Sequence, residues 1–176
     1  MFSKYSRYRV LKVFLDNPTE EFGLREISRL SKLAPVSVIK YLKEFEDEYL
    51  IRKLKKKGKP IYQAARDNND FIFYKKIGIL YELHTSNLIE QLWDKLSPEA
   101  IILYGSHAKG EAIENSDIDI FLIGKEGIFD LEKYKEKLGK RVHLIFDANV
   151  KNISKELKNN LINGIILKGY FRVFQW

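Results

Sequence analysis

The sequence contains no cysteine, which excludes disulfide bonds and metal sites built on thiolates. No stretch reaches the roughly 18 to 20 uninterrupted apolar residues that a helical membrane span requires, and no signal peptide is visible. We therefore expect no membrane partner and take the cytoplasm as the simplest location. What the chain does have is 176 residues with 45% hydrophobic content, enough for one large or two small domains with a core in each.

The charge is unevenly distributed along the chain. Residues 1–66 carry 16 Lys and Arg against 8 Asp and Glu, a net of +8, whereas residues 67–176 carry 15 against 16, a net of −1. The overall net charge of +7 therefore comes entirely from the N-terminal part. Such an asymmetry between segments indicates a nucleic-acid surface in the basic part.

Two acids flank an apolar residue at the start of a second apolar run in the C-terminal part, as Asp117-Ile118-Asp119-Ile120. Because alternate residues of a strand share a face, both carboxylates should project together while Ile118 and Ile120 face the core. Magnesium usually takes one or two carboxylates and completes its shell with water and substrate phosphates. The pair therefore predicts a divalent-cation site with a nucleotide partner.

A Gly105-Ser106 pair ends the preceding apolar run, and ten residues separate it from the first of these acids. Glycine at the end of a strand lets the backbone approach an anion, and a serine hydroxyl with the amides of a following helix can hold phosphate. Taken separately, the pair reads as an ordinary turn and the acids as the exposed edge of a half-buried strand. Together they favour a site for a metal-bound nucleotide.

This spacing from the Gly-Ser pair to the Asp-Ile-Asp segment resembles the signature of the DNA polymerase beta nucleotidyltransferase superfamily, in particular its minimal members, over roughly residues 98–170. The resemblance implies transfer of NMP from an NTP to a protein or nucleic-acid hydroxyl, with release of pyrophosphate and with Mg²⁺ or Mn²⁺ as cofactor. It assigns metal binding to Asp117 and Asp119 and triphosphate binding to Gly105 and Ser106. We further expect Lys109, three residues after Ser106, to neutralise phosphate charge.

One position departs from the family pattern. The family usually has a third carboxylate in the middle of the next strand, predicted here at 141–146, where His143 stands instead. An imidazole can accept a proton near neutral pH but suits magnesium poorly. His143 could act as a base or as a ligand of another metal, it could mark a site that binds nucleotide without transferring it, or the predicted register is wrong. Asp147 lies about 13 Å further along the same face, too far to replace it.

The basic N-terminal part has a different pattern. Apolar spacing predicts helices at 8–15, 22–30 and 35–49, followed by two short strands around a lysine-rich turn. This pattern resembles a winged helix-turn-helix domain, in which the second helix of the pair enters the major groove of double-stranded DNA and the hairpin wing contacts the backbone. The implied contacts are Ser37, Lys40 and Lys43 on the helix and Lys55, Lys56, Lys57 and Lys59 on the wing.

Simpler interpretations of this part remain open. The lysine run could be a solvated hairpin tip, winged helices also bind RNA or protein, and the acidic residues within 44–48 limit how closely the third helix can approach phosphate. If five to eight basic side chains meet phosphates, the logarithm of the affinity should fall against log salt with a slope of roughly −5 to −7.

The two parts are joined by a segment, 69–96, whose apolar residues recur every three and four positions. We predict a long helix there, broken near Gly78, that packs against both domains or partly against a second copy. The predicted organisation is α+β: a winged helix-turn-helix at 1–66, a connecting helix at 67–97, and an α/β nucleotidyltransferase-like domain with a small mixed sheet at 98–176. Its strands are predicted near 100–105, 117–123, 141–146 and 165–173, and its helices at 106–111, 128–138 and 153–162.

Two functions follow from this organisation. The first is a magnesium-dependent nucleotidyltransferase directed by its DNA-binding part. The second is a DNA-binding transcriptional regulator, of the toxin-antitoxin type with a protein partner, whose transferase domain is catalytically impaired and senses nucleotide. A homodimer is a further expectation, since winged-helix regulators that read palindromes are dimers by symmetry.

Overall fold

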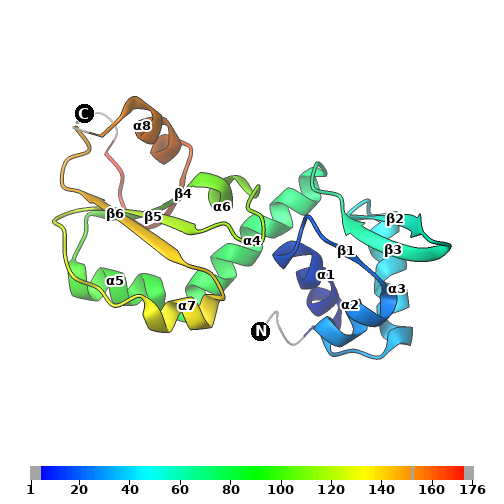
Figure 1. Cartoon of the computed structure of the whole chain (residues 1–176). Helices are drawn as coiled ribbons and strands as arrows, with labels where there is room; N and C mark the ends of the chain where they lie inside the picture. The colour runs from blue at the N-terminus through cyan, green and yellow to red at the C-terminus, as the bar shows by residue number, and fades with distance from the viewer. Residues whose placement is uncertain (1–4, 152, 173–176) are drawn as a thin grey trace. The chain divides into compact units, whose positions relative to one another are not determined.

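The computed structural model describes residues 5–151 and 153–172, and it is α+β (Figure 1). The chain divides into two compact units, Met1–Lys75 and Lys76–Trp176. Each unit has its own cluster of buried apolar side chains. None of the described helices combines the length and the apolar character that a membrane crossing needs.

Within its described residues, the first unit holds three whole helices, the beginning of a fourth, and a three-stranded antiparallel sheet in the order β1-β3-β2. The three predicted helices are present, each within about two residues of the expected ends, and the predicted hairpin follows them. Strand β1, only two residues long, was not predicted. The elements are α1 (Ser6–Asp16), β1 (Glu21–Phe22), α2 (Leu24–Ser31), α3 (Pro35–Asp47), β2 (Ile51–Lys56) and β3 (Lys59–Ala64).

Helix α3 begins at Pro35, where the missing N–H and the fixed φ of proline are harmless. Its residues Val38, Leu42 and Phe45 are buried, as their spacing predicts. They pack with buried residues of α1 and α2, such as Phe14. The inward stripe leaves the opposite side of α3 free to carry exposed side chains.

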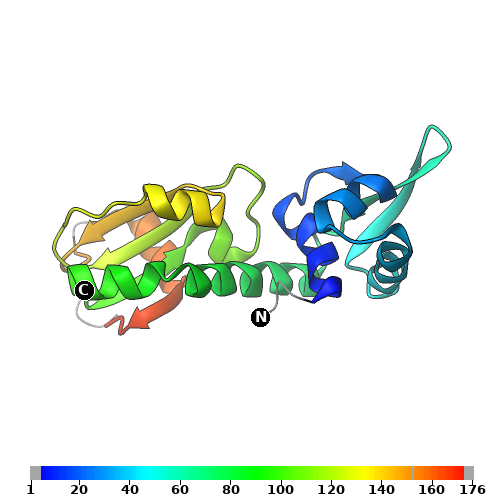
Figure 2. The ribbon, with the colours of Figure 1, turned by 90° about the horizontal axis from the view of Figure 1, so that it is seen from below.

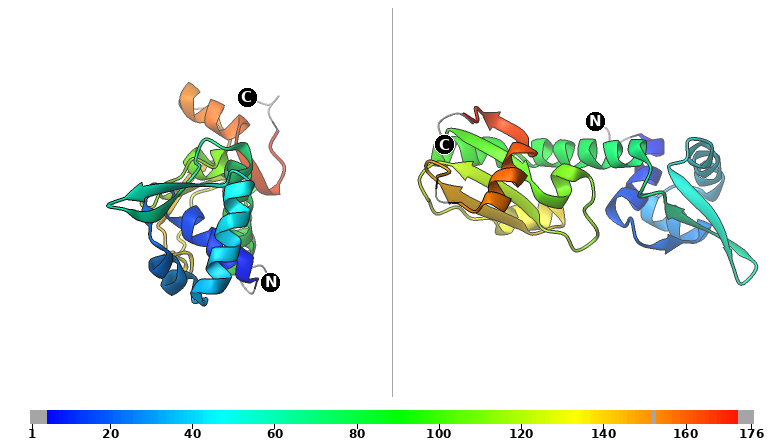
Figure 3. Two further views of the ribbon diagram at one scale, coloured as in Figure 1. Left: turned by 90° about the vertical axis from the view of Figure 1, so that its right-hand side faces the viewer. Right: turned by 90° about the horizontal axis from the view of Figure 1, so that it is seen from above.

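The β2–β3 hairpin extends away from this core (Figure 3). Only Ile51 of β2 is buried, and the rest of the strand is exposed. The turn places Lys57 and Gly58 at positive φ, 49° and 76°, which is the backbone of the tight two-residue hairpin turns. The hairpin therefore presents its lysines to solvent along nearly its whole length.

The predicted break near Gly78 is wrong. Helix α4 runs unbroken through Gly78, and the interruption comes at Asn87, between α4 (Asn69–Ser86) and α5 (Leu88–Leu96). Asn87 adopts φ +63°, a left-handed conformation that asparagine tolerates better than most residues. A glycine inside a helix costs only about 1 kcal/mol relative to alanine, which the burial of neighbours such as Ile79 and Leu83 outweighs.

The second unit contains a four-stranded mixed sheet in the order β6-β5-β4-β7. Strands β5 and β6 are parallel, whereas β4 is antiparallel to both β5 and β7. All four predicted strands and the three predicted helices are present; α7 starts later than expected and β7 ends earlier, and position 173 of the predicted last strand lies outside the described residues. The elements are β4 (Ala100–Tyr104), α6 (Gly105–Lys109), β5 (Ile118–Ile123), α7 (Glu132–Leu138), β6 (Val142–Asp147), α8 (Lys155–Ile162) and β7 (Ile165–Gly169).

Helices cover both faces of this sheet. Helices α5 and α7 pack on one face, where Leu92 and Tyr134 meet β-strand residues such as Ile120 (Figure 2). Helix α8 packs on the other, where Leu161 meets Phe121 (Figure 3). All five residues of β4 are buried, as expected for a central strand covered on both sides.

Candidate functional site

The two acids of the sequence motif lie where β5 begins. Ile118 and Ile120 are fully buried, while the side chains of Asp117 and Asp119 are 38% and 28% exposed. The alternation along the strand is therefore the one predicted, with both carboxylates on the α8-facing side of the sheet. They stand at the end of the strand, where solvent and a ligand can reach them.

The Gly-Ser turn is brought directly against the second acid. Tyr104, the last residue of β4, pairs with Asp119 across the sheet, and α6 begins at the next residue, Gly105. Gly105 has φ +70°, and a Cβ atom there would lie 2.6 Å from Oδ2 of Asp119. Only glycine satisfies both the backbone conformation and this close approach.

The other predicted phosphate-binding residues lie on the short helix α6. Ser106 is half-buried next to the turn, whereas Lys109 is exposed. His107, between them, is buried, and its Nε2 lies 3.4 Å from the carbonyl oxygen of Ser116. This histidine therefore connects α6 to the loop that precedes the acids.

His143 lies beside Asp119 on the neighbouring strand. The two residues pair in the parallel β5–β6 register, and His143 Nδ1 is 3.4 Å from Asp119 Oδ1. The structure thus excludes a register error and leaves the other two interpretations of His143 open. Asp147 pairs with Ile123, four positions along, and its Oδ1 accepts the backbone N–H groups of the two residues of the following turn, Asn149 and Val150.

Sequence reasoning missed a basic residue at this site. Nη2 of Arg141 donates to Oδ2 of Asp117 at 3.1 Å, and its Nε donates to Oδ1 at 3.4 Å. The hydrogen bond and the attraction of Asp117 raise the pKa of Arg141 above its ordinary value. The two predicted strands begin at Asp117 and at Arg141. Parallel pairing of these strands places the two residues side by side, but the sequence pattern does not show which strands pair.

A second missed residue is Tyr104, hidden in the sequence within an apolar run. It is buried, and burial together with the nearby negative charge of Asp119 raises the pKa of its phenol to about 12. Tyr104 therefore stays neutral at physiological pH. With its partners on β5 and β6 it forms a polar row across three strands, Tyr104, Asp119 and His143.

The donor set of the site suits a metal that arrives with a nucleotide. Within residues 5–151 and 153–172, no three His, Cys, Asp or Glu side chains gather into a metal site. Magnesium nevertheless needs only one or two carboxylates when phosphates and water supply its other oxygens. Asp117 and Asp119 fit that requirement and are the residues that would hold it.

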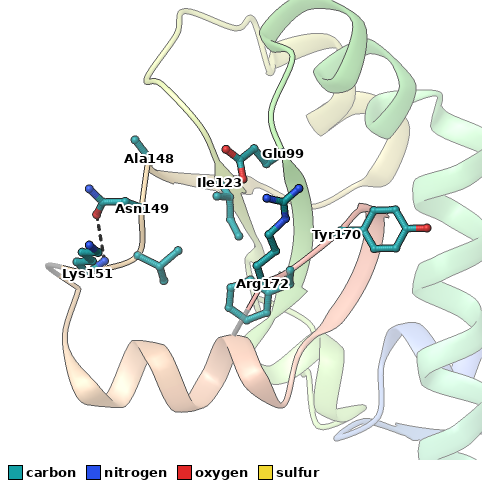
Figure 4. A pocket seen from close by; sticks show the side chains of 9 residues that line it. Glu99, Ile123, Ala148, Asn149, Lys151, Tyr170 and Arg172 are labelled. Atoms are coloured by element: carbon teal, nitrogen blue, oxygen red, sulfur yellow. Dashed lines mark hydrogen bonds between the residues drawn. The ribbon is translucent and has the colours of Figure 1, made fainter. Parts of the chain in front are cut away.

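A separate pocket of about 280 Å³ lies at the opposite end of the same sheet (Figure 4). Its lining includes Ile123, which is four residues from Asp119 along β5 and so about 13 Å away. Figure 4 shows Arg172 reaching toward Glu99, whereas the Tyr170 ring points away from them. None of the predicted site residues lines this pocket.

In the first unit, the basic side chains predicted to meet DNA are mostly exposed. Lys40 and Lys43 on α3 and Lys55, Lys57 and Lys59 on the hairpin are exposed, whereas Ser37 is half-buried. Lys56 is exposed too, but its Nζ lies 2.5 Å from Glu21 Oε2 on β1.

Three acidic residues in and directly after α3 form ion pairs within their own unit. Glu44 and Glu48 both form ion pairs with Arg7 of α1, at 3.2 Å and 2.5 Å, and Glu46 lies 3.9 Å from Lys53 of β2. These pairs partly neutralise the acidic run that was expected to limit the approach of α3 to phosphate.

Comparison with known proteins gives matches in the second half of the chain. Residues 86–168 match the nucleotidyltransferase domain family. A Methanocaldococcus jannaschii protein provisionally named protein adenylyltransferase MJ1379 is 37% identical over 81 residues, covering 40% of this chain and 81% of the relative. A second from the same organism, provisionally named protein adenylyltransferase MJ0128, is 35% identical over 79 residues, with the same coverage of 40% and 81%. No solved structure gives a significant match.

The matched region runs from the end of α4 to β7 and so includes the sheet, the Gly-Ser turn and both acids. The chain also covers 81% of the length of each of the two relatives, at 37% and 35% identity. The chain therefore belongs to the nucleotidyltransferase domain family.

Proposed function

We propose that this protein transfers AMP from ATP to a hydroxyl group of a protein, in a reaction that depends on Mg²⁺ or Mn²⁺, and that its first unit binds double-stranded DNA. The observation that carries the enzymatic part is the pair Asp117 and Asp119 at the start of β5, with the Gly105 turn pressed against the second carboxylate. The protein acceptor is suggested by the names of the two relatives. A nucleic-acid hydroxyl is the alternative acceptor.

The roles follow from the positions. Asp117 and Asp119 hold the metal, the Gly105-Ser106 turn holds the triphosphate, and the exposed Lys109 neutralises phosphate charge. When bound, Mg²⁺ stabilises the charge on the attacking and leaving oxygens of the in-line displacement. The acceptor oxygen bonds to the α-phosphorus as the bond to pyrophosphate breaks. His143, which is exposed beside Asp119, accepts the proton of the acceptor hydroxyl.

A second candidate function rests on one specific observation. The strand position next to Asp119 carries an imidazole where the family usually has a carboxylate, and Asp117 is paired with Arg141. In this second candidate, the domain binds nucleotide without transferring it, and the protein is a DNA-binding regulator that senses nucleotide.

The DNA-binding part of the proposal rests on the first unit. Helices α2 and α3 are joined by a short turn and followed by the β2–β3 hairpin, the order of elements in a winged helix-turn-helix domain. The exposed lysines of α3 and of the hairpin lie where such domains contact DNA. The net charge of +8 on residues 1–66 suits a polyanionic partner.

The enzymatic proposal is tested by incubating the protein with labelled ATP, GTP, CTP or UTP, Mg²⁺ or Mn²⁺, and candidate acceptors. Asp117→Asn and Asp119→Asn should each reduce label transfer by about 100-fold or more, because each removes a charged metal ligand. Asp94→Asn, at an exposed carboxylate of α5 in the same unit, is the matched control and should transfer label like the wild type.

The two candidate functions separate at His143. A nucleotide-dependent rise in melting temperature without label transfer favours the regulator. If His143→Asp then gains turnover, the site is disabled by that residue alone; if wild-type transfer exists and this variant loses it, His143 has a catalytic role. His84→Asp makes the same change at an exposed histidine of α4 and should alter neither result.

A further inference from the structure

Arg141 occupies both oxygens of one of the two carboxylates assigned to the metal. Its Nη2 and Nε donate to Oδ2 and Oδ1 of Asp117, so the guanidinium lies across the carboxylate edge that a cation would approach. A dication on that edge would compete with the guanidinium for the same oxygens and repel its charge. The metal and Arg141 therefore cannot share this edge of Asp117.

The backbone of Arg141 is fixed while its side chain is free to move. Its carbonyl oxygen accepts the N–H of Ile118 at 2.8 Å, which holds it beside the start of β5. Its side chain is 72% exposed, so it can turn toward a ligand without disturbing the core. A guanidinium fork matches a phosphate as well as it matches a carboxylate.

We propose that Arg141 is a transferable counter-ion: it neutralises Asp117 while no metal is bound, and it binds the β- or γ-phosphate of the nucleotide once the metal takes that carboxylate. This inference rests on the proposed function of the site. It adds a phosphate-binding residue to those predicted from the sequence. It also makes metal binding and triphosphate binding depend on the same side chain.

The first test measures Mn²⁺ affinity without nucleotide, by electron paramagnetic resonance or calorimetry. Arg141→Gln should bind Mn²⁺ about threefold to tenfold more tightly than the wild type, because Asp117 is released and a nearby positive charge is removed. Arg141→Lys keeps the charge without the fork and should lie between the two. Arg52→Gln, which removes another exposed Arg–Asp pair, with Asp67 in the first unit, should leave Mn²⁺ affinity unchanged.

The second test measures nucleotide affinity at saturating Mn²⁺, so that the metal step no longer contributes. Arg141→Gln should bind a non-hydrolysable ATP analogue about tenfold more weakly, through the loss of a charge-assisted hydrogen bond, while its affinity for AMP stays unchanged. Arg141→Lys should recover part of the loss. An equal loss for AMP and the ATP analogue would show that Arg141 does not reach the β- or γ-phosphate and would overturn the inference.

The failure of this inference is distinguishable from that of the proposed function. If Arg141→Gln binds Mn²⁺ no more tightly than the wild type, the proposed role of Arg141 is wrong. If in the same experiments the wild type transfers label and Asp117→Asn does not, the proposed transferase function still stands. If neither the wild type nor Arg141→Gln binds Mn²⁺, with or without nucleotide, both proposals fail. Because Arg141 is exposed, the variant should fold normally, which circular dichroism checks.

Discussion

At the scale of single residues, Gly105 shows how one missing side chain shapes the site. Its positive φ and the 2.6 Å between an added Cβ and Asp119 Oδ2 are two separate constraints on the same residue. Gly139, in the same unit, has φ +64° but nothing within 4 Å of an added Cβ. Comparing the two positions separates the cost of the backbone conformation, which both share, from displacement of the Asp119 carboxylate, which only Gly105 can cause.

We predict that Gly139→Ala lowers the free energy of unfolding by about 1 kcal/mol, the cost of a left-handed conformation for a residue with a Cβ. Gly105→Ala should lower it by a similar amount, because the atom that the added Cβ meets is the end of the Asp119 side chain, which can turn aside at little cost. It should also reduce label transfer by displacing the carboxylate. Chemical unfolding and the transfer assay measure both effects.

Retention of wild-type label transfer in Gly105→Ala would contradict the argument. It would mean that the turn relaxes away from Asp119 at little cost. Gly105→Ser adds the same Cβ with a polar group and should resemble Gly105→Ala.

The residues of the site that could be predicted were those marked by a local pattern. The alternation of apolar and acidic residues gave the side of the sheet for Asp117 and Asp119, and the Gly-Ser pair gave the turn. Arg141 and Tyr104 could not be found in this way, because each meets an acid only through pairing between strands. Which strands are neighbours is a property of the assembled sheet and leaves no mark on either strand alone.

At the scale of elements, periodicity predicted the long helices and strands within a few residues. It failed for β1, since two residues are too short to show an alternation. It also misplaced the break between α4 and α5, because the low helix propensity of glycine predicts a break at Gly78 when the burial of neighbouring residues is left out. Buried neighbours hold Gly78 in the helix, and the left-handed Asn87 makes the turn instead.

The β2–β3 hairpin carries a prediction at this scale. We expect wild-type affinity for duplex DNA to fall with salt at a log–log slope of roughly −5 to −7, and the triple change of Lys55, Lys57 and Lys59 to Gln should make the slope less steep by about 3. The weakening should be nearly uniform across DNA sequences, because phosphate contacts carry no base code. Fluorescence anisotropy over a salt series measures both quantities.

A matched control removes the same charge from the second unit, with Gln at the exposed lysines Lys125, Lys135 and Lys155. This variant should keep the wild-type slope. A wild type that does not bind duplex DNA at low salt, or that binds it without salt dependence, would show that the lysine run is a solvated hairpin tip.

At the scale of the whole molecule, the described residues form one core cluster in the first unit and two in the second, and no residue belongs to a cluster in both units. The first cluster ends with Phe71, and the second begins with Ile79, both on α4. The charge is divided in the same way, since residues 1–66 carry +8 and the remainder −1. The two proposed binding sites therefore lie in units with separate cores.

We predict that the two proposed activities are separable. Asp119→Asn should lose label transfer and keep wild-type DNA affinity, whereas the triple hairpin variant should bind DNA more weakly and keep its rate of label transfer measured without DNA. A parallel loss of both activities in either variant, with the fold intact by circular dichroism, would show that the units depend on one another.

The polar row of Tyr104, Asp119 and His143 has a consequence for how the sheet finds its alignment. Successive residues of β5 face opposite sides, so a slip by one position would push Asp119 into the apolar layer under α5 and α7 and turn an isoleucine out to water. Burial of a charged group without a partner costs far more than a lost apolar contact. The acids that we propose as metal ligands thus also penalise misaligned sheets, so that correct folding of the second unit aligns the proposed site in the same step.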